Sequence, residues 1–162
     1  MLRRVLKAAL VLVALVVLTL VGVGVAARFH DGPIGPFPGG AFVAGDVAGP
    51  GASDFSAVKG VDTLELEMTP DHPRSITAWF VVVGGTLYVP SASAAKKTWP
   101  GLVAADGRVR VRIGGKIYDL QATRVTESAI AGLIAEAVTA KYGFGDGSPV
   151  EGAWAFELLP RS

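Results

Sequence analysis

The short stretch from Ser93 to Trp99 gathers the residue types that could bind an anion. It reads Ser-Ala-Ala-Lys-Lys-Thr-Trp, a grouping of Ser, Lys and Trp that the rest of the chain does not repeat. Hydroxyl groups, lysines and free backbone N–H groups at the start of a helix suit a phosphate, and Trp99 could cover a planar ring by stacking on it. The alternative is a solvated turn with one anchoring tryptophan. The same letters match the Ser-x-x-Lys of serine acyl-enzymes, but the Ser-Asp-Asn and Lys-Thr-Gly partners of that site are missing from the sequence.

A second set of charged side chains follows one predicted strand. Arg108, Arg110 and Arg112 alternate with apolar residues, which puts three guanidinium groups on one face of the strand. Three like charges repel unless something pairs with them, and Glu65 and Glu67 are the expected cross-strand partners. An anionic ligand, or lipid headgroups, is the alternative partner.

Composition excludes several kinds of site. The chain has no cysteine, which excludes disulfides, thiolate catalysis and Cys-based metal sites. Its two histidines, His30 and His72, stand alone, so we predict no metal site. The net charge of +1 gives no case for a nucleic-acid partner. Tyr88 and Trp79 either line a pocket or fill the core.

Strands and tight turns must position these residues. Val61 to Met68 alternates cleanly between apolar and polar residues, as a half-buried strand does. Two Gly-Gly pairs separate runs rich in β-branched and aromatic residues, which predicts two β-hairpins. The expected order is strand 76–83, the most apolar and therefore central; strand 86–89; a short helix and loop within 91–105; strand 108–113; and strand 116–125.

The C-terminal third predicts one more helix and one more strand. Thr126 is the expected N-cap, and apolar residues follow it at helical spacing. Lys141 and Gly143 mark the end of this helix, and Ala153 to Leu159 forms a last strand. Hairpin-rich strands with two small helices predict an antiparallel α+β fold or a small barrel.

The N-terminus predicts export. Residues 8–27 carry no charge, and about twenty helical residues span the roughly 30 Å of a bilayer core. Arg3, Arg4 and Lys7 precede this run, so the positive-inside rule places the N-terminus in the cytoplasm. We therefore expect a single-pass protein of the cell (inner) membrane, in contact with lipid through residues 8–27, with its domain on the outer or periplasmic side. A signal peptide cleaved near Val25-Ala26-Ala27 is the alternative.

The predicted organisation has three parts. Residues 1–27 form the membrane anchor (or uncleaved signal), 28–60 a Gly/Pro-rich extended arm, and 61–162 the barrel domain. Apolar residues in the arm predict that it packs on the domain from about Phe37 onward, whereas a free spacer would not need them.

The order of these elements resembles that of a known superfamily. TAWFVVVGGTLYVPS, then DGRVRVRIGGKIYDLQATRV, the helix end AKYG and the final AWAFELLP look like the flavin-binding split β-barrel. That superfamily includes pyridoxamine-phosphate-oxidase-like and deazaflavin-dependent nitroreductase-like proteins. The resemblance covers about Val61 to Pro160 and implies a small antiparallel split β-barrel with two short helices.

The resemblance also implies a ligand and a set of residues to hold it. The cofactor would be FMN or a deazaflavin, with Ser91, Ser93, Lys96 and Lys97 at its phosphate. Trp99, Tyr88 and Arg110 complete the set of cofactor-binding candidates. Many flavin binders carry a base in the strand that corresponds to Ala78–Val83, and this strand has none.

Two functions therefore stay open, and with them whether the protein is an enzyme. One is a reductase that binds FMN or a deazaflavin. The other is a non-catalytic ligand- or partner-binding module of the cell envelope that binds no cofactor. Pairing into a homodimer is implied by the resemblance alone.

Overall fold

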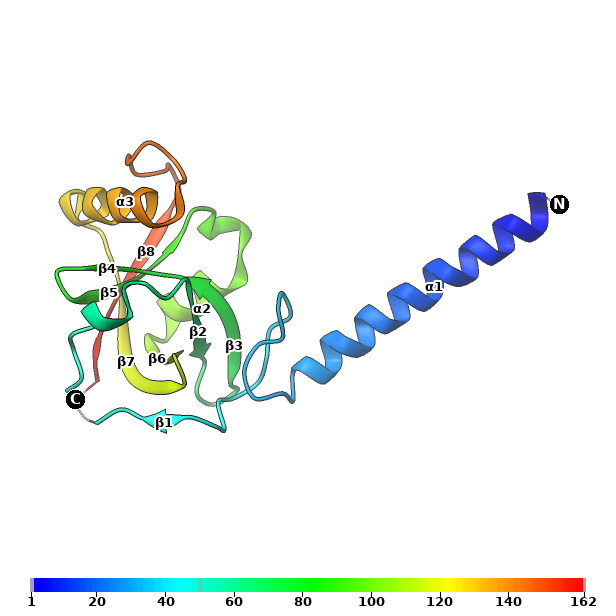
Figure 1. The fold of residues 1–162 in the computed structure, drawn as a ribbon, viewed down its shortest axis with the longest axis horizontal. Coiled ribbons are helices and arrows are strands. Elements are labelled where there is room, and N and C mark those ends of the chain that lie inside the picture. The colour runs from blue at the N-terminus through cyan, green and yellow to red at the C-terminus, as the bar shows by residue number, and fades with distance from the viewer. Residues whose placement is uncertain (1, 50, 162) are drawn as a thin grey trace.

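A computed structural model describes residues 2–49 and 51–161 of the chain, in which a long helix projects from a barrel (Figure 1). Residues 1, 50 and 162, which fall in the predicted anchor, arm and barrel domain, lie outside the described residues. The elements are α1 (Leu2–Ala27), β1 (Asp46–Val47), η1 (Ser56–Val58), β2 (Thr63–Met68), β3 (Arg74–Trp79), β4 (Val81–Val83), β5 (Thr86–Ser91), η2 (Ala94–Lys96), α2 (Thr98–Ala105), β6 (Arg108–Ile113), β7 (Lys116–Arg124), α3 (Ser128–Tyr142) and β8 (Trp154–Pro160).

The strands form one antiparallel sheet that closes through a bend in the chain. Their order is β3-β2-β6-β7-β8-β5-β4, and the short β1 pairs in parallel with β7. β3 and β4 are consecutive in the sequence but lie at opposite ends of this order, and Phe80 joins them. The predicted α+β split barrel is thus confirmed. The expected central strand 76–83 is wrong: it is two strands, and each is terminal.

The break at Phe80 has a local cause. Its side chain is fully buried in the core, while its backbone N–H and C=O lie outside both strands. The Tyr142 hydroxyl accepts a hydrogen bond from the Phe80 N–H at 3.1 Å and lies 2.8 Å from the Phe80 carbonyl oxygen. A buried backbone group needs such a partner wherever the ladder is interrupted.

Both predicted Gly-Gly turns are confirmed. Gly84 and Gly85 join β4 to β5, and Gly114 and Gly115 join β6 to β7. All four have a positive φ, between 58° and 83°. Two successive left-handed residues make the type of hairpin turn whose twist matches the strands, and glycine adopts that conformation without steric cost.

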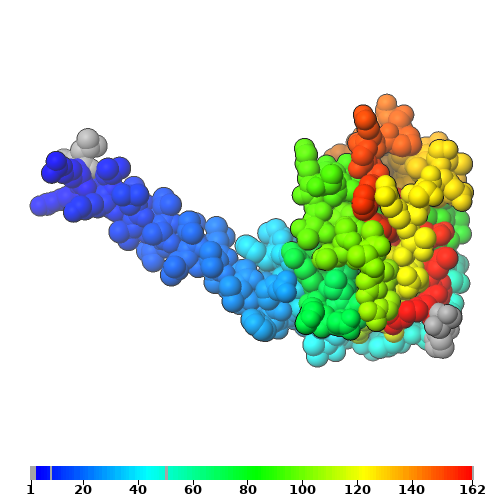
Figure 2. Space-filling view, turned by 180° about the vertical axis from the view of Figure 1, so that it is seen from behind, coloured from blue at the N-terminus to red at the C-terminus, as the bar shows by residue number. Residues whose placement is uncertain are grey.

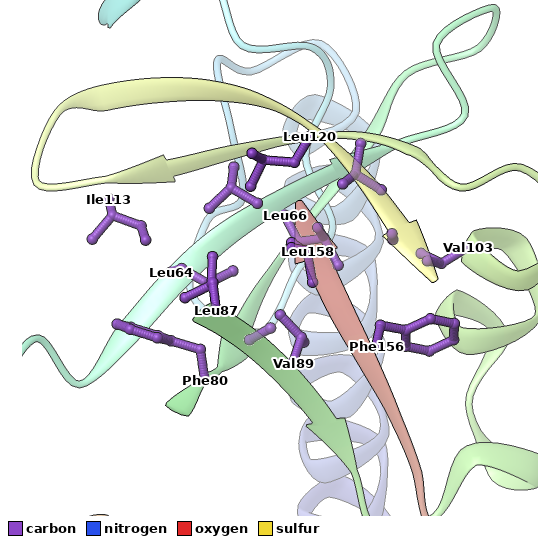
Figure 3. Close-up of a cluster of buried hydrophobic side chains, with 14 of the residues drawn as sticks. Leu64, Leu66, Phe80, Leu87, Val89, Val103, Ile113, Leu120, Phe156 and Leu158 are labelled. Atoms are coloured by element: carbon purple, nitrogen blue, oxygen red, sulfur yellow. The ribbon is translucent and has the colours of Figure 1, made fainter. Parts of the chain in front are cut away.

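The core fills the barrel and follows the alternation of the strands. Leu64, Leu66 and Met68 of β2 point inward, as the sequence predicts, and are almost fully buried. Figure 3 shows the inward side chains of the facing strands meeting them, with Val103 of α2 closing one end. A smaller cluster, centred on Tyr88 and Ile134, packs α3 against β4 and β5. The two short helices therefore cover different parts of the barrel.

The bounds of α3 correct one prediction. The helix begins at Ser128 with Glu127 at the N-cap position, so the predicted cap at Thr126 is wrong. Neither residue makes a side-chain capping bond that would fix the start. The predicted end is confirmed, because Gly143 has a φ of 72° and its N–H bonds to the Thr139 carbonyl at 2.9 Å.

The N-terminal helix is long and apolar enough to span a membrane. Its large side chains from Val5 to Val25 are exposed, which leaves an apolar surface that the barrel does not cover. The same length and composition also suit a signal sequence. At its end Ala27 is fully buried, because the arm folds back there.

Candidate functional site

The predicted anion-binding stretch lies at one end of the barrel, between β5 and β6. Ser93 precedes the short helix η2, and α2 begins directly after Lys97. Ser93, Lys96 and Lys97 are exposed, whereas Trp99 is half-buried and tilts against Phe156 with 5.7 Å between ring centroids. The stretch is therefore an exposed basic loop that a single tryptophan, Trp99, fixes to the barrel.

A hollow of about 220 Å³ opens beside this loop. Lys97 and Trp99 form one wall, Ile76 and Thr77 of β3 another, and the arm turn, residues 35–38, the third. Two of the seven predicted residues thus line one hollow. Lys96 and Ser93 lie on the adjoining exposed loop.

Ser91 lies inside the barrel, away from solvent. β5 extends two residues beyond the predicted end, through Pro90 to Ser91, and pairs with β8 along this length. Ser91 follows the buried Leu87 and Val89 on the inward face, so it is only 1% exposed. Among the residues that the structure describes, its hydroxyl has no hydrogen-bond partner.

Tyr88 belongs to the second core cluster, beneath α3. It points to the opposite face of β5 from Ser91 and is 5% exposed. Its hydroxyl donates to the Glu157 carboxylate at 3.0 Å. Burial, together with the bond to Glu157, raises the pKa of this phenol. Tyr88 therefore does not line the hollow.

Arg110 and its neighbours form ion pairs on the outer face of the sheet. The register places Glu67 opposite Arg110 and Glu65 opposite Arg112. Arg110 Nη1 lies 3.3 Å from both Glu67 oxygens, and Arg112 Nε lies 2.5 Å from Glu65 Oε2. The predicted cross-strand pairing is confirmed. Arg108 bonds instead to Asp106, with 2.7 Å between Nη2 and Oδ2.

The arm covers this charged face, which the apolar residues of the arm predict only in part. Phe42 is 4% exposed; its N–H donates to Glu67, and its carbonyl accepts from Arg110 Nη1 at 3.2 Å. The Arg112 guanidinium lies 4.5 Å from the centroid of the Phe42 ring. The prediction that apolar arm residues pack on the domain is confirmed, and it explains why Glu67 is buried rather than solvated.

Asp31 fixes the beginning of the arm, although nothing in the sequence singled it out. Its carboxylate accepts from Arg112 Nη1 at 2.8 Å and from the N–H groups of Val43 and Ala44 at 2.8 and 3.1 Å. Burial raises the pKa of Asp31, but these hydrogen bonds outweigh it, and the net pKa lies below 3.8. An Asp that precedes Gly32 in a proline-rich stretch reads as a turn residue, which hides this role.

Two adjacent glycines let the arm lie against β3. Gly39 exchanges two backbone hydrogen bonds with Ser75, at 2.9 and 3.0 Å, and the Ser75 hydroxyl donates to the Gly40 carbonyl at 2.7 Å. A Cβ on Gly39 would overlap the Gly32 carbonyl. The arm therefore packs tightly against the barrel and depends on glycine at this point.

A second polar cluster lies at the bend, where α3 meets Phe80. The Lys141 ammonium donates to the Phe80 carbonyl at 2.9 Å and lies 3.7 Å from the centre of the Phe80 ring. Burial lowers the pKa of Lys141. Nearby, the Trp79 ring stacks on Tyr142 and on Phe144, with centroids 5.2 and 5.1 Å apart. These contacts join the helix to the bend and leave Trp79 half-exposed.

A flavin or deazaflavin, the cofactor implied by the resemblance, does not fit these residues as one site. The hollow is smaller than the roughly 300–1,000 Å³ of typical cofactor pockets. Ser91 and Tyr88 are buried, and Arg110 is paired and covered by Phe42. Within residues 2–49 and 51–161, no three His, Cys, Asp or Glu side chains gather as they would around a metal ion.

Comparisons with known proteins agree with the fold. A family model described as "Uncharacterized protein conserved in bacteria (DUF2255)" matches residues 55–157. No curated protein matches the sequence significantly.

Solved structures with this fold share little sequence with the chain. A candidate pyridoxamine 5′-phosphate oxidase from Listeria innocua superposes with a TM-score of 0.52 at 20% identity, over 65% of this chain and 88% of that one. A conserved hypothetical protein from Mycobacterium tuberculosis gives 0.55 at 17%, over 71% and 87%. A candidate 5-nitroimidazole resistance protein from Bacteroides thetaiotaomicron gives 0.51 at 11%, over 67% and 81%. At such identities the likeness establishes the split-barrel fold alone, as the sequence resemblance predicted.

Proposed function

The chain belongs to the DUF2255 family of bacterial proteins, and from this premise we propose that it is a membrane-anchored, non-catalytic binding module of the cell envelope. One observation carries the proposal: the chain's own arm covers the charged face of the sheet that bears Arg110 and Arg112. Arg110 and Arg112 bond to Glu67, Glu65 and Asp31, which leaves no free guanidinium there for a cofactor phosphate.

The proposed anchor is α1. The basic residues Arg3, Arg4 and Lys7 support an N-terminus in the cytoplasm and a barrel on the outer side. A reporter that is active only in the cytoplasm, fused after the barrel, should be silent, while the protein should stay in the membrane fraction after alkaline extraction. An active reporter would contradict this topology and place the barrel in the cytoplasm. Release of a shortened chain into the soluble fraction would identify α1 as a cleaved signal.

The second candidate is a reductase that binds FMN or a deazaflavin. It is favoured by Lys97 and Trp99, which line one hollow and offer a cation for a phosphate and a ring for stacking. The arm turn would have to move to admit a tricyclic ring, because Pro36 and Phe37 form a wall of that hollow.

Visible spectroscopy separates the two candidates. The full chain, purified in mild detergent, should be colourless and should leave the absorbance and fluorescence of added FMN or deazaflavin unchanged. Saturable binding would overturn the non-catalytic proposal. If Lys97→Ala then weakened that binding and Lys59→Ala, which removes an exposed lysine elsewhere, did not, the flavin would lie in the hollow.

A further inference from the structure

We propose that the hollow and its lysines form a contact for an anionic membrane surface, with a lipid phosphate seated against Lys97 and Trp99. The inference rests on the proposed membrane anchor and adds a ligand class to it. It does not depend on which reaction, if any, the barrel carries out.

The hollow lies next to the end of the helix. Gly24, in the last turn of α1, faces Phe37, and a Cβ placed on it would touch that ring at 3.7 Å. Phe37 in turn lines the hollow together with Lys97 and Trp99. Figures 1 and 2 both show the arm turn between α1 and the barrel, on the side from which the helix departs. A bilayer around α1 would therefore face this end of the barrel.

The side chains at this end are those that favour a membrane interface. Phe29 is 89% exposed and Ile34 is 37% exposed, although both are apolar and belong to an otherwise fitted arm. Trp99 presents a half-buried indole to the hollow. Tryptophan concentrates where a membrane meets water, because its ring is largely apolar and carries one polar N–H group. Exposed apolar side chains such as Phe29 and Ile34 gain from entering the same layer.

Unpaired positive charge accompanies these apolar groups. Arg28, Lys96 and Lys97 are exposed, and within residues 2–49 and 51–161 no carboxylate lies within ion-pair distance of any of them. The strand arginines differ, because Arg108 and Arg112 each have a carboxylate within 3 Å. Basic side chains that form no ion pair within the protein attract anionic headgroups when they lie close to a bilayer.

The hollow itself suits one phosphate group. Its volume of about 220 Å³ lies below the roughly 300–1,000 Å³ of typical cofactor pockets and is large enough for a headgroup. Thr77 and Lys97 provide polar atoms, while Pro36, Phe37 and Ile76 provide apolar walls for the hydrocarbon part of a lipid. A long lysine can extend its ammonium group to the headgroup and keep its stem against those walls.

A single fluorescent label tests the contact in the full chain. Because the protein has no cysteine, Ser93→Cys gives one labelling site on the exposed loop. The labelled chain is placed in nanodiscs of phosphatidylglycerol or phosphatidylcholine that carry a headgroup nitroxide quencher. We expect strong quenching of the label in phosphatidylglycerol and about half of that quenching, or less, in phosphatidylcholine. Added salt should reduce the quenching in phosphatidylglycerol.

Two charge variants decide the outcome. Lys96→Ala/Lys97→Ala should reduce quenching in phosphatidylglycerol to the phosphatidylcholine level, whereas Lys59→Ala/Lys116→Ala, which removes two other exposed lysines, should leave it unchanged. Equal quenching in both lipids, or equal loss in both variants, would overturn the contact. If the chain did not enter nanodiscs at all, the anchor itself would fail, which is a separate result.

Discussion

Arg112 and Asp31 lie 81 residues apart in the sequence, yet Nη1 of one bonds to Oδ1 of the other at 2.8 Å. The same guanidinium binds Glu65, the Ala44 carbonyl at 2.8 Å and the Asp31 carbonyl at 3.2 Å. One side chain thus holds two points of the arm, Asp31 and Ala44, to strand β2. It is the central link between the arm and the barrel.

Removing this link should destabilise the barrel. Arg112 is only 15% exposed, and Arg112→Ala would leave Asp31 and Glu65 without their cation, at a cost of about 3 kcal/mol in the free energy of unfolding. Arg108→Ala, at a pair that is 46% exposed on the arginine side, should leave the free energy of unfolding nearly unchanged, because water and salt screen an exposed pair. Urea unfolding in mild detergent, followed by tryptophan fluorescence, measures both. Equal effects would contradict the central role of Arg112.

Acid should loosen the arm through Asp31. Its folded pKa lies below the ordinary 3.8, so the stabilisation is complete above that value and is lost as the pH falls from there through the folded pKa. The protection factors of the Val43 and Ala44 amides against hydrogen exchange, which correct for the intrinsic rate at each pH, should fall over that interval. Asp31→Asn should show low protection at every pH, while Asp106→Asn, which removes another carboxylate with a lowered pKa, should keep the pH response. Protection that does not change with pH in the wild type would refute the role of Asp31.

Two buried serines should respond in opposite ways to alanine. Ser75→Ala removes the hydroxyl that satisfies the Gly40 carbonyl and should cost about 1–2 kcal/mol. Ser91→Ala removes a buried hydroxyl that lacks a partner and should be neutral or stabilise by up to about 1 kcal/mol. Thermal unfolding compares them. A large loss in Ser91→Ala would show that its hydroxyl has a bound partner, and would revive it as a ligand contact.

The bend at Phe80 should depend on one phenol. Tyr142→Phe leaves the Phe80 N–H without its acceptor and should cost about 1–3 kcal/mol. Tyr118→Phe is the matched control, because its ring packs on Phe55 and its hydroxyl makes no hydrogen bond to the described residues. In denaturant unfolding, the free energies of unfolding of the two variants should differ by more than about 1 kcal/mol, which is roughly the net contribution of one hydrogen bond.

Local patterns in the sequence predict much of this fold. The Gly-Gly turns specify their hairpins because few other residues adopt two positive φ angles in succession. The alternation of Arg110 and Arg112 with apolar residues predicts their pairing with Glu67 and Glu65, because register follows from which faces are buried. Both features depend on neighbours in the strand or across one ladder.

Other features depend on contacts that no local pattern contains. The run from Ile76 to Val83 is apolar except for Thr77, so nothing in it marks the break at Phe80, whose N–H bonds to a hydroxyl 62 residues away. Pro90 predicts the end of a strand and so places Ser91 in a loop, yet β5 continues through both residues, because a proline is accepted where the strand pairs on one side only. Asp31 acts through folded-back backbone amides, which have no sequence signature.

The fitted arm determines how the barrel moves. A free Gly/Pro-rich linker would let the domain move by roughly tens of ångströms relative to α1, independently of the helix. Here Ala27 is buried, and Asp31, four residues after the last helical residue, already bonds to Arg112 of the barrel. Gly39 and Phe42 add further hydrogen bonds to the barrel along the arm. Helix α1 and the barrel are therefore mechanically coupled through the arm. Any tilt or rotation of α1 would turn the whole domain with it.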